Sequence, residues 1–295
     1  MEDFILTCCS TTDMYADYFH KRDIPYAYFH YMIDGKTYDD DYGKSMPVDR
    51  FYQLIKEGAA PTTSQVNAEE FMHLWKPYLE KGKAILHLTL SSGISGVYNS
   101  AKIAEQMANE EYPNAKVIVI DSLCASSGYG MLVDYVADLR DTGVSIDQAA
   151  EWVETNKLNI HHWFFSTDLS SYVRGGRISK PEALLGSLLK VCPLLNMDDE
   201  GRLIPREKVR TKRRVIQAMF EKMQAFAQDG AEYDGKCFLS NSACLEDAQA
   251  VVDLIEAYFP KLKGKVLINN IGTVIGSHTG PGTVALFFMG NKRTK

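Results

Sequence analysis

The first half of the chain alternates short apolar runs with segments of helical periodicity. Four runs have the length and composition of strands: Phe4 to Cys8, Tyr26 to Tyr31, Ala84 to Leu90 and Val117 to Ile120. The last two are apolar at almost every position, which is typical of parallel strands covered on both faces. Helices are expected near residues 47–57, 67–81, 95–110, 126–141 and 146–157. This order predicts a three-layer α/β/α domain with a mainly parallel sheet over residues 1–158.

Local start signals support two of these helices. Asn67 is followed three residues later by Glu70, and Ser145 is followed three residues later by Gln148. This is the spacing of a capping box, in which two side chains satisfy the free amides at a helix start. We therefore expect helices to begin at these two positions.

The second half has a different pattern. Strands are expected at His162 to Ser166, Cys237 to Ser240, Lys265 to Ile271 and Thr283 to Met289, and helices at roughly 180–190, 208–229 and 244–259. The last two strands are joined by a Gly-rich loop without an evident helix, so an antiparallel or mixed pairing is expected rather than a parallel crossover. Residues 159–295 are therefore predicted to form a two-layer α+β domain with a mixed sheet.

Composition narrows the class of protein. The chain has 295 residues, 45% hydrophobic and 24% charged, as in folded soluble proteins. The 38 Asp and Glu outnumber the 32 Lys and Arg, which argues against a globally basic nucleic-acid-binding protein. No apolar run approaches the roughly 18 residues of a membrane helix, and Met1-Glu2-Asp3 is acidic where a signal peptide would be basic. We expect a cytoplasmic protein that binds no nucleic acid.

Motifs for metals and nucleotides are missing from the sequence. The six cysteines and seven histidines show no metal-site spacing, and the cysteines are expected to be reduced. Gly128 and Gly130 lack a third glycine at Val133, and no Gly-Lys-Ser or Gly-Lys-Thr phosphate loop is present. We therefore expect neither a metal nor a nucleotide cofactor.

Three polar, turn-rich segments interrupt the apolar pattern, at residues 61–65, 91–96 and 276–282. The second follows a predicted parallel strand and opens a helix, so its hydroxyls and amides should face the edge of the sheet where anions bind. An N-cap role for Ser91 or Ser92 would explain one hydroxyl, but not the two nearby glycines. An anion site is therefore expected here.

A serine hydrolase is the alternative in a different functional class. Ser95 lies in Gly93-Ile94-Ser95-Gly96, where the second glycine comes one residue too early for the G-x-S-x-G elbow. His278 lies in a Gly-rich segment, where an imidazole could donate to an oxyanion or act as a general base. A hydrolase or transferase using Ser92 or Ser95 with His278 therefore stays open.

Positive charge is concentrated in the segments 172–180 and 206–214. For the second, a solvated helix face is the default interpretation. In the first, Gly175 and Gly176 precede Arg177, a pattern that suggests a shaped loop presenting a guanidinium to a phosphate or a carboxylate.

Taken together and in this order, five motifs resemble the DegV family of bacterial fatty-acid-binding proteins, whose better-understood members are the lipid-carrying subunits of fatty acid kinase. The resemblance spans nearly the whole chain. The motifs are Thr63-Ser64-Gln65, the S-S-G-x-S-G of Ser91 to Gly96, Asp121-Ser122, the G-G-R-I of Gly175 to Ile178, and the I-G-x-x-I-G-x-H-T-G-P-G of Ile271 to Gly282.

The resemblance implies a two-domain fold with one long-chain fatty acid buried between the domains. The implied carboxylate ligands are Thr63, Ser92 with the Gly93 amide, and His278 with Thr279, and Arg177 and Arg210 would meet a kinase partner. The implied protein is a carrier without catalysis of its own, which presents the fatty acid to the catalytic subunit of fatty acid kinase for acyl-phosphate formation in phospholipid metabolism. Transient contact with a membrane surface is compatible with this role. A sensor of another hydrophobic acid is a further alternative.

The chain departs from the family near its N-terminus. The family usually reads T-D-S-x-x-D, whereas residues 8–13 here place Cys9 where the first aspartate is expected. A thiol does not accept hydrogen bonds as a carboxylate does. Whatever that aspartate orients in relatives is expected to be absent or rearranged.

Overall fold

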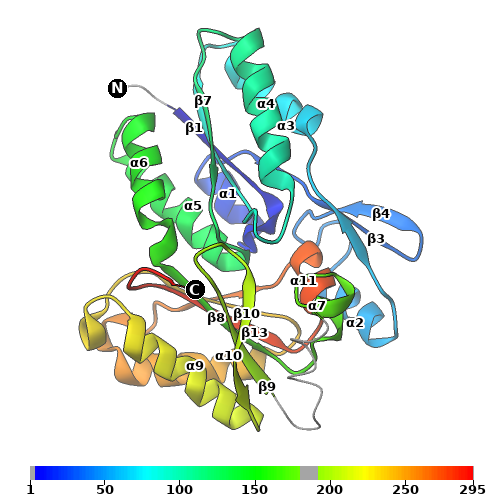
Figure 1. The fold of residues 1–295 in the computed structure, drawn as a ribbon, viewed down its shortest axis with the longest axis vertical. Helices are drawn as coiled ribbons and strands as arrows, with labels where there is room; N and C mark the ends of the chain where they lie inside the picture. The colour runs from blue at the N-terminus through cyan, green and yellow to red at the C-terminus, as the bar shows by residue number, and fades with distance from the viewer. Residues whose placement is uncertain (1–3, 180–191, 295) are drawn as a thin grey trace.

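The computed structural model describes residues 4–179 and 192–294, which form two α/β halves stacked along the long axis of the molecule (Figure 1). The helix expected at roughly 180–190 lies outside the described residues. In the described part, no helix combines the length and the apolar character needed to cross a bilayer.

The N-terminal half contains a four-stranded parallel sheet between two layers of helices. The strand order is β2 (Tyr26–Ala27), β1 (Phe4–Cys9), β6 (Ala84–Thr89), β7 (Val117–Asp121). Helices α3 (Ala68–Leu79) and α4 (Val97–Glu111) lie on one face, and α5 (Ser126–Asp141) and α6 (Ile146–Asn156) lie on the other (Figure 1). Both expected capping boxes are present, so the predicted starts of α3 and α6 are confirmed.

A small antiparallel sheet beside this half was not predicted. Its strands are β4 (Lys36–Asp39), β3 (His30–Ile33) and β5 (Thr62–Ser64), and α2 (Val48–Lys56) packs nearby. Helix α1 (Ala16–Lys21) lies instead against α5, where Tyr18 donates to Asp134. The prediction of a single strand at Tyr26 to Tyr31 is wrong. Strand β2, which pairs with β1, ends at Ala27, and the chain joins a different sheet at His30. This second sheet carries Thr63 on β5.

The C-terminal half contains a six-stranded mixed sheet. The order is β10 (Leu203–Val209), β9 (Cys192–Met197), β8 (Ile160–Ser166), β13 (Thr283–Met289), β11 (Cys237–Asn241), β12 (Leu267–Asn270). Helices α9 (Lys212–Phe226) and α10 (Leu245–Tyr258) cover the face away from the N-terminal half (Figure 1). β11 pairs parallel with β12 and antiparallel with β13, so the expected mixed sheet is confirmed.

Two expectations in this half are wrong. The helix expected at 208–229 begins only at Lys212, because Leu203–Val209 pairs with Cys192–Met197 as an unpredicted hairpin. Residues 273–279, expected as loop, form the short helix α11 (Thr273–Thr279), which faces another short helix, α7 (Ser170–Arg174).

Buried carboxylates of the N-terminal half anchor the start of α11. The amide of Gly272 donates to Asp13 over 2.9 Å, and the hydroxyl of Thr273 donates to Asp40 over 2.7 Å. Asp13 also accepts from Ser126, the first residue of α5. Burial raises the pKa of both carboxyl groups. These contacts join the two halves and fix the helix that carries His278.

Candidate functional site

A cavity lies between the two halves. Arg177 is the one residue of permanent charge among the described residues that line it. The apolar part of the wall includes Phe29, Leu90, Phe164, Met197, Leu203 and Val274. The cavity can therefore accept a mainly apolar ligand that carries one polar group.

Strand β13 gives the cavity a direction. Thr283, Ala285 and Phe287 all line it, as expected for alternate residues on one face of a strand. Ala285 and Phe287 pair with Phe164 and His162 of β8, which line it too. At about 3.3 Å per residue, Thr283 and Phe287 are about 13 Å apart. The Thr283 end adjoins α11, and the Phe287 end adjoins the start of α5.

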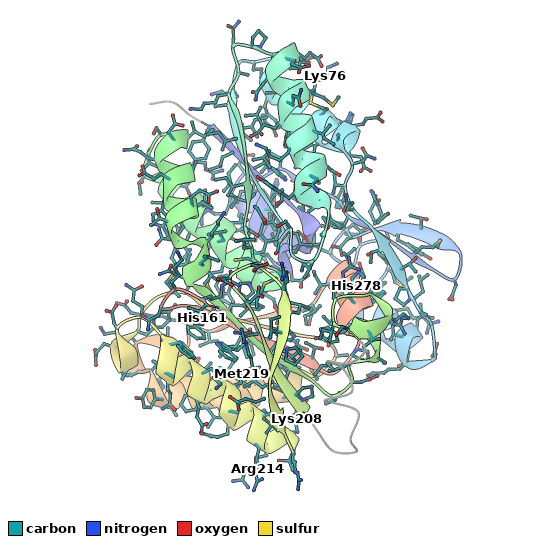
Figure 2. All side chains as sticks on the ribbon, viewed as in Figure 1. Lys76, His161, Lys208, Arg214, Met219 and His278 are labelled. Carbon is teal, nitrogen blue, oxygen red and sulfur yellow. The ribbon has the colours of Figure 1, made fainter. Side chains whose placement is uncertain are left out.

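At the α11 end, two expected site residues meet. The Oγ1 atom of Thr63 on β5 lies 2.8 Å from Nε2 of His278 on α11. Figure 2 shows His278 on α11, where this helix lies next to α7 and the small antiparallel sheet. Thr63 and His278 come from different halves of the molecule, as the family resemblance implies for an anion site between the domains.

Further hydroxyls lie at the same end. The Oγ1 atom of Thr279 is buried and has no hydrogen-bond partner among the described residues, although it lines the cavity. A buried polar atom without a partner is costly and calls for a ligand or a water. Ser95 also lines the cavity, and its Oγ accepts from the Val97 amide over 3.2 Å.

Polar atoms at the opposite end are satisfied within the protein. His162 accepts from the Ala125 amide at Nε2 over 3.2 Å, and its Nδ1 lies 3.0 Å from the Ile160 carbonyl oxygen. The Ser126 hydroxyl donates to Asp13 over 2.5 Å. The α11 end is therefore the end that fits a polar head group.

The structure places Ser92 and Gly93 outside the cavity lining. The Ser92 side chain is exposed, and its amide donates to Asp121 over 3.1 Å. Ser91, which is buried, donates instead to the Gly201 carbonyl in the turn of the β9–β10 hairpin over 2.8 Å. A β-carbon at Gly93 would lie 2.4 Å from the same oxygen. The S-S-G turn therefore seats the hairpin, and Ser95 is the serine of this motif that reaches the cavity.

Arg177 is half-buried on the cavity wall. Its Nε donates to the Ile94 carbonyl over 3.1 Å, and Nη1 donates to the Gly175 carbonyl over 2.6 Å. Nη1 also lies 3.4 Å from Nδ1 of His278. The guanidinium expected to face a kinase partner thus contacts the residue expected to hold the carboxylate.

His278 is neutral at pH 7. Burial first, and then the charges of Arg177 and Arg174, lower its pKa to about 4. A neutral imidazole donates from one ring nitrogen only. His278 therefore acts at this site by hydrogen bonding rather than as a cation.

Arg210 and Cys9 lie away from the cavity lining. Arg210 follows β10 and is exposed. Cys9 is buried at the end of β1, where its amide donates to the Tyr129 hydroxyl over 2.9 Å and its thiol lies 3.8 Å from Nε2 of His87. Burial raises the pKa of the Cys9 thiol, which is protonated at neutral pH. In the described part of the chain, no group of three or more His, Cys, Asp and Glu side chains could hold a metal ion.

Sequence reasoning missed several lining residues: Ser126, His162, Tyr172, Thr283 and Ala285. A signal existed for two of these, because alternation along the expected strand Thr283 to Met289 puts Thr283 and Ala285 on one face. The others depend on packing between the two halves.

Comparisons with known proteins agree with this architecture. The family model described as "Uncharacterised protein, DegV family" matches residues 7–291. A DegV domain-containing protein of Clostridium perfringens is 36% identical over 293 residues, which cover 99% of both chains. The DegV domain-containing protein YteA of Lactococcus lactis is 34% identical over 283 residues, with 96% of each chain covered.

Solved structures show the same fold. A structure titled as fatty acid binding of a DegV family protein from Thermus thermophilus matches with a TM-score of 0.84 and 28% identity, covering 98% of this chain and 99% of that one. A fatty acid binding DegV family protein from Streptococcus agalactiae matches with a TM-score of 0.84 and 26% identity, covering 99% and 100%. The Fatty Acid Kinase (Fak) B3 protein of Streptococcus pneumoniae, solved with linoleic acid, shares the fold with a TM-score of 0.83 and 19% identity, covering 98% and 99%. The chain described here belongs to the DegV family.

Proposed function

We propose that this protein binds a long-chain fatty acid in the cavity between its halves, with the carboxylate at the α11 end and the acyl chain along β13. The observation that carries the proposal is that the cavity has a mainly apolar wall and a cluster of polar groups at one end. Its wall is mainly apolar, and the unpartnered buried hydroxyl of Thr279 lies at the same end as the Thr63–His278 pair. The fatty acid binding named for the Thermus thermophilus and Streptococcus agalactiae relatives supports the same ligand class.

Burial of the acyl chain supplies the affinity. Each buried methylene contributes about 0.8 kcal/mol, so a chain of about sixteen carbons contributes roughly 12 kcal/mol. Association costs an estimated 4–15 kcal/mol in lost translational and rotational freedom, which offsets a substantial part of this gain. Tight retention is therefore favoured when little of the protein has to be ordered on binding.

The carboxylate needs donors because an unpaired charge is expensive to bury. Thr63 and Thr279 can each donate a hydroxyl proton, and Ser95 lies on the same wall. Hydrogen bonds to the charged form keep a buried carboxyl ionised. This set of donors fits a monovalent carboxylate.

The bonding of His278 favours a carrier over a serine hydrolase. Its Nε2 atom is 2.8 Å from Thr63, and no hydrogen bond joins its ring to Ser92 or Ser95 within the described residues. An activated nucleophilic serine is paired with its base, whereas the described contacts pair His278 with Thr63.

The test is mass spectrometry of organic extracts of the purified protein, with an equal amount of an unrelated protein taken through the same purification. We expect a near-stoichiometric long-chain fatty acid in the first extract only. An empty protein that also takes up no added palmitate would contradict the proposal.

A second step of the proposal is that the bound fatty acid is presented, in the cytoplasm, to the catalytic subunit of a fatty acid kinase, which forms the acyl phosphate. The motif resemblance supports this step. Exposed Arg210 is the expected partner contact. Arg210→Glu should slow acyl-phosphate formation with kinase and ATP while bound palmitate is unchanged. Lys76→Glu, at an exposed site at the far end of the molecule (Figure 2), is the matched control. Equal rates for both variants, or loss of palmitate in the first, would remove Arg210 from the partner surface.

A further inference from the structure

The G-G-R-I and H-T-G-P-G motifs pack against each other at the head of the cavity. A β-carbon at Gly175 would lie 2.2 Å from Nδ1 of His278, so only glycine lets the end of α7 approach the ring this closely. A β-carbon at Gly280 would lie 2.8 Å from Oγ of Ser171 on α7. The two motifs therefore form one structural unit, and the unit determines what faces each nitrogen of His278.

The two ring nitrogens face opposite kinds of group. Nδ1 faces the Arg177 guanidinium, whose Nη1 lies 3.4 Å away. Nε2 faces the Thr63 hydroxyl at 2.8 Å. A guanidinium only donates and never accepts, whereas a hydroxyl does both. The Arg177 side is therefore compatible with a bare nitrogen and unfavourable for an N–H group.

The position of Arg177 is held by two further bonds. Its Nε donates to the Ile94 carbonyl over 3.1 Å and its Nη1 to the Gly175 carbonyl over 2.6 Å. These acceptors belong to the loop after β6 and to the end of α7. The cation is thus held beside His278 by backbone groups from both halves of the molecule.

The tautomer of His278 decides what Thr63 can offer a ligand. With the proton on Nε2, the ring donates to Thr63, and the hydroxyl proton of Thr63 is free for a carboxylate. With the proton on Nδ1, the bare Nε2 would instead accept the Thr63 proton, and Thr63 would have no donor left. The position of this proton on the His278 ring therefore decides whether the Thr63 hydroxyl can donate a hydrogen bond to the ligand.

We propose that Arg177 is a positioning residue that selects the Nε2–H tautomer of His278 and thereby orients the hydroxyl proton of Thr63 toward the carboxylate of the ligand. The ligand part rests on the proposed function, and the tautomer part concerns the empty protein as well. Arg177 thus acts through His278 and Thr63.

The first test is nitrogen-15 NMR of ligand-free protein labelled at histidine, with the His278 signals identified by their loss in His278→Gln. The Nε2–H tautomer should dominate in the wild type and in Arg177→Lys, which keeps the charge. Arg177→Gln should raise the share of the Nδ1–H tautomer. The opposite tautomer in the wild type, or the same tautomer in Arg177→Gln, would overturn the proposal.

The second test is a double-mutant cycle for palmitate binding with Arg177→Gln and Thr63→Val, using Thr63→Ser as the control that keeps the hydroxyl. Each of the first two variants should bind about ten- to a hundredfold more weakly, the range for a lost hydrogen bond to a charged group. Their combination should be no weaker than Thr63→Val alone, because Arg177 acts through Thr63. Additive losses would assign Arg177 an independent role and contradict the proposal. A wild-type protein without affinity for any fatty acid would defeat the proposed function, whereas the NMR result would still decide the tautomer.

Discussion

Gly175 lies so close to His278 that a β-carbon at position 175 would come within 2.2 Å of Nδ1 of the imidazole. The backbone at Gly175 has φ −76°, which any residue can adopt, so the need for glycine comes from the ring and not from the turn. This contact ties the end of α7 to the carboxylate end of the cavity.

Replacing Gly175 with alanine should therefore displace the ring and break the Thr63–His278 bond. We expect palmitate affinity to fall about tenfold or more, since a hydrogen bond to a charged group depends on that geometry. Titration of delipidated protein with palmitate measures this.

Gly176→Ala is the matched control for this substitution. Gly176 has φ +70°, and a β-carbon at this position would meet no atom within 4 Å. Alanine here adds backbone strain of about 1 kcal/mol without touching His278. It should lower the melting temperature and leave the affinity unchanged. Equal losses of affinity in both variants would contradict the role of the Gly175–His278 contact.

The S-S-G turn gives a prediction about the cavity wall. Gly93→Ala should push away the hairpin turn, because the new β-carbon would lie 2.4 Å from the Gly201 carbonyl oxygen. The hairpin carries Met197 and Leu203 in the cavity wall, so bound lipid should exchange faster. Displacement of a fluorescent fatty acid by excess palmitate measures the exchange rate.

Ser92→Ala serves as the comparison, because the Ser92 side chain is exposed. Its exchange rate should match the wild type. A large loss of retention in Ser92→Ala would instead support a direct role of this hydroxyl at the carboxylate.

Ala285 should limit how much acyl chain fits. It lies between Thr283 at the polar end and Phe287 at the apolar end, and all three share one face of β13. Ala285→Leu fills the middle of the cavity and should shift the extracted lipids toward shorter chains. Leu286→Met, on the opposite face of the strand, should leave the distribution unchanged. An unaltered distribution in Ala285→Leu would mean that the chain does not pass β13.

Stability should depend on pH through His278. Burial, then the charges of Arg177 and Arg174, lower its pKa in the folded protein to about 4 from its ordinary value of 6.5. Between these values the unfolded chain binds a proton that the folded protein does not, so stability falls as pH falls from 6.5 to 4. One such group contributes a slope of at most about 1.4 kcal/mol per pH unit.

Urea unfolding of the wild type and His278→Asn at pH 7, 6 and 5 measures this contribution. The variant should lose less stability on acidification than the wild type. His87, whose pKa burial lowers to about 3, contributes in the same direction in both proteins and cancels in the comparison. Identical slopes would show that His278 takes up a proton as readily in the folded state as in the unfolded chain.

The regular elements with strong local signals were predicted best from the sequence. Apolar runs predicted β6, β7 and β13, and capping boxes located the starts of α3 and α6. These signals are local, so a single sequence carries them.

Elements held by distant contacts were missed. The strand Leu203–Val209 carries three consecutive charged residues and a proline, and only its pairing with Cys192–Met197 makes it a strand. Helix α11 is too short to be stable alone, and Asp13 and Asp40 of the other half anchor its first turn.

The candidate site was predictable only in part, because its motifs are local signals and its detailed contacts depend on distant segments. The motifs brought Thr63, His278 and Thr279 to one end of the cavity. They did not separate Ser92 from Ser95, because that depends on the hairpin turn that occupies Ser91 and Gly93. Nor did they reveal that Arg177 folds inward, since its acceptors are backbone carbonyls, which no motif records.

The most direct test of fatty acid binding in this cavity is a crystal structure of the protein loaded with palmitate. We predict the carboxylate within hydrogen-bond distance of Oγ1 of Thr63 and Oγ1 of Thr279, with the acyl chain passing Ala285 toward Phe287. A carboxylate bound at Ser92, a chain in the reverse direction, or palmitate outside this cavity would contradict the proposed binding mode.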